Sequence, residues 1–139
     1  MMNQESSRSQ RIMIPVNADA DSRRGVADAL RRHRDGMPLD VILLHVAEPI
    51  DQWQVLRCMT RAEVADFQSR SAECILDEAA RPLKEAGIPC RTLYRSGSVV
   101  PTILDVAAQE GCDEILLPPP TPRWRRLFSR DIVRRLRRR

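Results

Sequence analysis

Four strand-like segments alternate with longer segments of helical periodicity, and this alternation constrains the fold of the chain more than any other feature. The expected strands are residues 12–16, 39–46, 90–95 and 114–117. Strands separated by helices form βαβ units, whose parallel strands are joined by right-handed crossovers. The sequence therefore predicts an α/β fold built on a parallel sheet of about four strands.

The strand-like segments predict different places in that sheet. Residues 39–46 are nearly continuous in apolar side chains, as a strand covered on both faces requires, so we expect them to be central. Residues 90–95 alternate polar and apolar side chains, which is typical of an exposed edge strand. Pro15 has no N–H to give to a ladder, so we expect a local defect in the first strand.

Capping signals and periodicity predict three helices between the strands. Ser22 and Ser98 are expected to cap the first and third helices, and Thr60 and Glu63 have the spacing of a capping box at the start of the second. Gly87 follows the second helix as a terminator. The expected inner faces are Val26, Ala29, Leu30 and His33 in the first helix, Ala65, Ala72, Ile75, Leu76, Ala79 and Leu83 in the second, and Val100, Ile103, Leu104 and Ala107 in the third.

Length and composition favour one domain outside the membrane. The chain has 139 residues, 42% hydrophobic and 30% charged, as in an ordinary globular domain. No apolar run approaches the roughly 20 residues of a membrane span, and residues 1–10 lack the apolar core of a signal peptide. We expect a disordered leader at 1–10, a single domain at 11–139 and a cytoplasmic location.

The basic charge is concentrated at the end of the chain. Residues 123–139 hold nine arginines and one acid, Asp131, so this segment carries about +8 while the whole chain carries +4. On a helical template Trp124, Leu127, Phe128, Ile132 and Leu136 share one stripe, which predicts a basic amphipathic helix. Two interpretations stay open. The stripe packs on the sheet and leaves the arginines solvated, or the helix binds nucleic-acid phosphate, an acidic membrane surface or an acidic protein.

The sequence offers little to catalysis. His33 and His45 lie on a helical inner stripe and inside a strand, where a histidine is more often packed or hydrogen-bonded than a ligand. No acid pair or nucleophile motif accompanies them, so we expect no enzymatic activity and no metal. The cysteines lack a C-x-x-C pair and predict reduced, mostly buried thiols; they are Cys58, Cys74, Cys90 and Cys112.

Four stretches in this order resemble the universal stress protein family. They are RIMIPV at residues 11–16, VILLHV at 41–46, LKEAGIP at 83–89 and GSVVPTILDVAAQEGCDEILL at 97–117. The resemblance implies a flavodoxin-like sandwich with strand order 3-2-1-4, helices on both faces and a homodimer. In one branch of the family it also implies an ATP site at the carboxyl ends of the strands.

That site would use an acid after the first strand, a backbone contact at the end of the second, and a loop spelled G-x-x-G, nine residues, then G-[S/T]. Here Val16 is followed by Asn17 in place of the acid, while Val46 matches the second position. The loop departs from the pattern, because its glycine positions hold Pro118, Thr121 and Asp131. A shorter register puts Ser129 and Arg130 at the final pair. We therefore expect Val16, Asn17, Val46, Pro118 and Thr121 to form a vestigial nucleotide pocket.

The prolines decide between two readings of this pocket. A phosphate cradle needs converging backbone N–H groups in conformations that glycine adopts easily, and the prolines at 118, 119, 120 and 122 have no N–H. We therefore predict a regulatory or interaction protein without a cofactor. The alternative is an atypical nucleotide binder for ATP with magnesium, in which Arg123, Arg125 and Arg126 hold the phosphates.

The chain also stops where the family adds a fifth strand. Residues 114–117 would then form an exposed sheet edge, which proteins usually protect. The prolines that follow, or pairing with a second copy in a homodimer, would supply that protection.

Overall fold

The computed structural model describes residues 9–18, 23–48 and 57–117. The elements in chain order are β1 (Gln10–Pro15), α2 (Arg24–Arg34), β2 (Leu39–Ala47), α4 (Arg61–Glu85), β3 (Cys90–Ser96), α5 (Val99–Gln109) and β4 (Glu114–Ile115). The expected leader, most of the linker before α4, the proline-rich segment and the basic helix at 123–139 lie outside the described residues.

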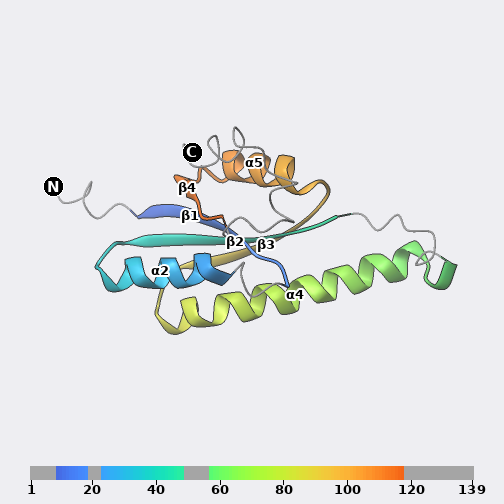
Figure 1. Ribbon diagram of the computed structural model, residues 1–139, viewed down its shortest axis with the longest axis horizontal. Helices are drawn as coiled ribbons and strands as arrows, with labels where there is room; N and C mark the ends of the chain where they lie inside the picture. Colours follow the sequence, from blue (N-terminus) through green and yellow to red (C-terminus); the bar gives the residue numbers. More distant parts are fainter. Residues whose placement is uncertain (1–8, 19–22, 49–56, 118–139) are drawn as a thin grey trace.

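The strands form one parallel sheet in the order β3-β2-β1-β4, as the sequence predicts. In Figure 1, α5 covers one face of this sheet, and α2 and α4 cover the other. The α/β prediction, the strand order and the helices on both faces are therefore confirmed. β2 is central and largely buried, whereas β3 is an edge strand whose residues are half-buried or exposed.

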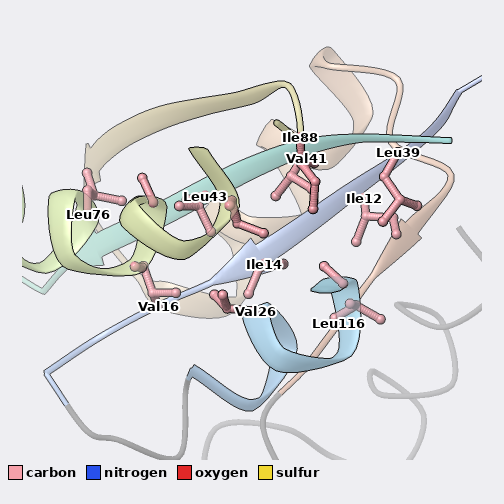
Figure 2. Packing of buried hydrophobic residues seen from close by; sticks show 14 residues of the cluster. Ile12, Ile14, Val16, Val26, Leu39, Val41, Leu43, Leu76, Ile88 and Leu116 are labelled. Carbon is pink, nitrogen blue, oxygen red and sulfur yellow. The ribbon is translucent and has the colours of Figure 1, made fainter. Parts of the chain in front are cut away.

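Two apolar clusters lie on the two faces of the sheet. Successive side chains of a strand point to opposite faces, so Ile12 and Ile14 enter the cluster under α2 and α4 while Met13 enters the one under α5. Figure 2 shows the larger cluster, in which Val26 of α2 packs beside Ile14. Both faces of β1 are therefore buried, which explains why it lies inside the sheet.

The defect expected at Pro15 falls on the β4 side of β1. Val16 donates its N–H to the Leu44 carbonyl of β2 at 2.8 Å, whereas the Met13 carbonyl accepts from Leu116 on the β4 side at 2.9 Å. Alternate residues of a parallel strand direct their backbone groups to the same side, so Pro15 faces β4. β4 ends at Ile115, two residues earlier than predicted, so the missing N–H of Pro15 falls beyond the end of β4. The central ladder between β1 and β2 is untouched.

The capping box of α4 is present. Thr60 Oγ1 accepts from the Glu63 N–H at 3.1 Å, and Glu63 Oε1 accepts from the Thr60 N–H at 3.2 Å. The expected cap at Ser98 is only half right, because Ser98 is the N-cap residue of α5 but its side chain makes no cap hydrogen bond. Ser22 lies outside the described residues, and α2 begins after Arg23.

Two predicted core positions, Ala65 and His33, are wrong. Ala65 is exposed, whereas its neighbour Val64 is buried, so the inner face of α4 in this turn passes through Val64 and not Ala65. His33 is also exposed. In the last turn of α2 only Arg32 is half-buried, and the other residues are exposed. The remaining inner positions of the three helices are buried or half-buried.

The prediction of mostly buried cysteines is wrong as well. All four are free thiols, but Cys58 and Cys74 are exposed, and Cys90 and Cys112 are half-buried. Cys74 lies on the outward side of α4. The spacing of apolar residues in the sequence did not show on which side of the helix this cysteine would lie.

Candidate functional site

The carboxyl ends of β1, β2 and β3 meet at one edge of the sheet, the place where open α/β sheets bind ligands. The register pairs Pro15, the last residue of β1, with Leu44 of β2. Val16 donates its N–H to the Leu44 carbonyl at 2.8 Å, so Val16 and Asn17 leave β1 next to the end of β2, where Val46 lies. Val16 is buried, and Asn17 and Val46 are half-buried. The structure thus brings together three of the predicted pocket residues. Their predicted companions, Pro118, Thr121, Arg123, Arg125 and Arg126, lie outside the described residues.

Gly97 ties the end of β3 to this edge. Its N–H donates to the Ala47 carbonyl at 3.0 Å, and its φ of 146° is a backbone conformation that residues other than glycine rarely adopt. A β carbon at Gly97 would also lie 3.2 Å from Thr102 Oγ1. The turn therefore delivers the start of α5 to the same edge, where the helix dipole favours negative charge.

His45 connects the first two strands at this edge. Its Nδ1 lies 2.9 Å from the carbonyl oxygen of Val16, and its ring stacks on Tyr94 of β3 with centroids 6.1 Å apart and planes 13° apart. The expectation that this histidine is hydrogen-bonded is confirmed. Its partner could not be read from the sequence, because the contact depends on the register of β1 against β2.

The opposite edge of the sheet carries ion pairs that hold β4 and α5 in place. Arg32 of α2 binds Glu114 at 2.8 Å, and Arg91 of β3 binds Glu110 at the end of α5 at 2.8 Å. Arg11 pairs with Asp40 at 3.1 Å and donates to the Glu110 carbonyl at 2.6 Å. These charges lie at the amino ends of the strands, so we assign them to the fold and not to the ligand edge.

Two pKa shifts follow from this charged edge. The hydrogen bond and charge of Arg32, assisted by Gln10, lower the pKa of Glu114 against the opposing effect of its partial burial. Partial burial is the largest influence on Cys112 and raises the pKa of its thiol to about 11. Cys112 is therefore a thiol at neutral pH and a poor nucleophile.

The described residues contain neither a membrane-spanning helix nor a metal-binding cluster. None of the helices there is both long and apolar enough to cross a bilayer. Nor does that part of the chain gather three or more histidine, cysteine or acidic side chains in a way that could hold a metal ion.

Solved structures share this architecture at low sequence identity. A universal stress protein family member from Burkholderia pseudomallei superposes with a TM-score of 0.68 at 13% identity, covering 91% of this chain and 86% of that one. A family protein from Arabidopsis thaliana with AMP bound gives 0.60 at 17%, covering 79% and 76%. A universal stress protein in complex with cAMP gives 0.56 at 16%, covering 78% and 75%. No curated protein sequence matches this chain.

The fold and its ligand edge define a doubly wound α/β protein of flavodoxin-like architecture, with its candidate site at the carboxyl ends of parallel strands. The model of the universal stress protein family matches residues 8–132. The chain belongs to the universal stress protein family.

Proposed function

We propose that this protein is a stress-response regulatory or interaction protein that does not bind ATP in the usual way of its family. The observation that carries the proposal is the segment after β4, where prolines at 118, 119, 120 and 122 replace a glycine-rich phosphate loop. Each proline removes a backbone donor that a phosphate would need. In this proposal the protein acts by binding a partner, without a cofactor and without catalysing a reaction.

Asn17 supports the same proposal. It follows Val16 at the end of β1, the place where the family resemblance implies an acid. An amide is neutral, and it offers one acceptor oxygen where a carboxylate offers two, so Asn17 is a weaker hydrogen-bond acceptor than the acid it replaces. The edge therefore keeps the strand ends of such a site and lacks its acid.

A second candidate function is atypical nucleotide binding. Structural relatives carry AMP or cAMP, and the edge formed by Val16, Asn17 and Val46 survives in this chain. In this reading Arg123, Arg125 and Arg126 replace the glycine loop and hold the phosphates of ATP with magnesium by charge.

The remaining parts of the proposal concern assembly and place. We propose a homodimer in the cytoplasm, with a protein partner as the physiological target. A third possibility rests on the nine arginines of residues 123–139, which suit phosphate groups of nucleic acid or acidic lipid. Binding of that kind weakens steeply with salt, whereas docking of a protein partner through apolar contacts does not.

Calorimetric titration with ATP and magnesium tests the first proposal against the second. We expect no heat of binding at millimolar ATP, and no change on replacing Asn17 by Asp, since the prolines remain. Binding that is lost in a variant with Arg123, Arg125 and Arg126 all changed to Gln would establish the second candidate. Inorganic phosphate serves as the control for adventitious anion binding.

A further inference from the structure

His45 makes two contacts that together fix its ring. The Nδ1 atom lies 2.9 Å from the Val16 carbonyl oxygen of β1, and the ring face stacks on Tyr94, its register partner in β3. His45 and Tyr94 belong to the adjacent strands β2 and β3, and Val16 directly follows β1, the strand on the other side of β2. They form a row across the carboxyl end of the sheet, on the face that α4 covers.

The hydrogen bond determines where the imidazole proton lies. A carbonyl oxygen only accepts, so His45 must donate from Nδ1. In its neutral form the ring then carries its proton on Nδ1 and its lone pair on Nε2, whereas neutral histidine in water favours the opposite tautomer. The contact with Val16 therefore selects one tautomer and one ring orientation.

Val16 lies at the point where the chain leaves β1, so its contact with His45 affects the direction of the following residue. Val16 follows the last residue of β1, and its N–H makes the last bond described here between β1 and β2, to Leu44 at 2.8 Å. With its N–H held by backbone and its carbonyl held by His45, the peptide joining Val16 to Asn17 has little freedom to rotate. The direction in which Asn17 leaves the sheet is set by that peptide.

We propose that His45 is the positioning residue of the candidate site: held as the Nδ1–H tautomer, it fixes the Val16–Asn17 peptide and so presents Asn17 at the ligand edge. Tyr94 holds the plane of the ring, and Gln68 of α4 donates to the Glu48 carbonyl at 3.0 Å, which ties α4 to the end of β2. The role does not depend on what occupies the edge, so it goes beyond the proposed function and can fail independently of it.

Nitrogen-15 spectra of the imidazole rings test the tautomer directly. The chain has two histidines, and exposed His33 serves as an internal control in the same sample. In a solution alkaline enough to keep both rings neutral, we expect His45 to show a protonated Nδ1 and His33 to show mainly a protonated Nε2. A His45 ring with its proton on Nε2 would overturn the proposal.

Matched variants separate positioning from packing. His45→Phe keeps a flat ring against Tyr94 and removes the donor, whereas His45→Asn keeps a side-chain N–H near the place of Nδ1 and removes the stack. We expect the carbon-13 shift of the Val16 carbonyl and the amide shift of Asn17 to move in the Phe variant and to return toward wild type in the Asn variant. His33→Phe should leave both unchanged.

The opposite ranking of the two variants would show that His45 acts only by packing. Unchanged shifts at Val16 and Asn17 in a folded Phe variant would likewise sink the proposal. If His45→Phe fails to fold, the tautomer measurement on the unmodified protein still decides. A nucleotide found to bind in the usual way would overturn the proposed function and leave the His45 result standing.

Discussion

Arg32 of α2 and Glu114 of β4 form a two-pronged ion pair, with the two terminal guanidinium nitrogens donating to the two carboxylate oxygens at 3.0 and 2.8 Å. The two residues are 82 positions apart in the sequence. Both side chains are largely covered, with 23% and 29% of their surface exposed. This pair anchors the shortest strand of the sheet to the helix beside it.

Removing the charge of Glu114 should destabilise the protein. Glu114→Gln keeps the size of the side chain but weakens two charge-assisted hydrogen bonds to Arg32, so we expect the free energy of unfolding to fall by about 1–3 kcal/mol. Chemical denaturation at neutral pH measures this change. Asp66→Asn is the matched control, because Asp66 and Arg70 form a strongly exposed pair, for which a loss below about 0.5 kcal/mol is expected. Equal effects at the two sites would contradict the assignment.

The same pair predicts how stability depends on pH. The pKa of Glu114 is lower in the folded protein than its ordinary value of 4.5. Its contribution is therefore fully present above that value and is lost as the pH falls through the folded pKa, since protonation then breaks the pair. Denaturation curves of the wild type and Glu114→Gln should differ at neutral pH and converge in acid. A gap that stays the same size as the pH falls from neutral into acid would mean that the substitution acts through packing.

A methyl group at Gly25 should destabilise the contact between α2 and the sheet. A β carbon there would lie 2.7 Å from Ile14 Cγ2 and 3.5 Å from Leu116 Cβ. Alanine normally stabilises a helix relative to glycine by up to about 1 kcal/mol, whereas overpacking of this kind costs about 1–3 kcal/mol. We expect a net loss in the unfolding free energy of Gly25→Ala. A net gain would show that α2 moves away from β1 at no cost.

The cysteines should differ widely in reactivity. Cys74 is exposed, whereas Cys112 is half-buried with the pKa of its thiol raised from 9.0 to about 11. Because the thiolate is the reactive form, the two-unit rise alone lowers the reactive fraction of Cys112 by about 100-fold at neutral pH. Alkylation with iodoacetamide, followed by peptide mass spectrometry over time, should label Cys74 well before Cys112. Equal labelling rates would contradict the conclusion that partial burial makes the Cys112 thiol less reactive.

Local patterns carried much of the fold prediction. The spacing of Thr60 and Glu63 predicted the start of α4, and the polar residues within 90–95 predicted that β3 is an exposed edge strand. The strand order came from the family resemblance. The same patterns misplaced Ala65 and His33. In α4 the buried face passes through Val64, one residue before Ala65, and in α2 the last turn that holds His33 is mostly exposed.

By itself, the sequence determined the class of the fold, its strand-helix alternation and the loss of glycine after β4, since these depend on residue types and their spacing. Only the tertiary structure decided that His45 binds the Val16 carbonyl and that Arg32 binds Glu114. Such contacts join residues far apart in the chain, and their partners are selected by strand register and helix placement. Both are set by the packing of the whole domain and by no single segment.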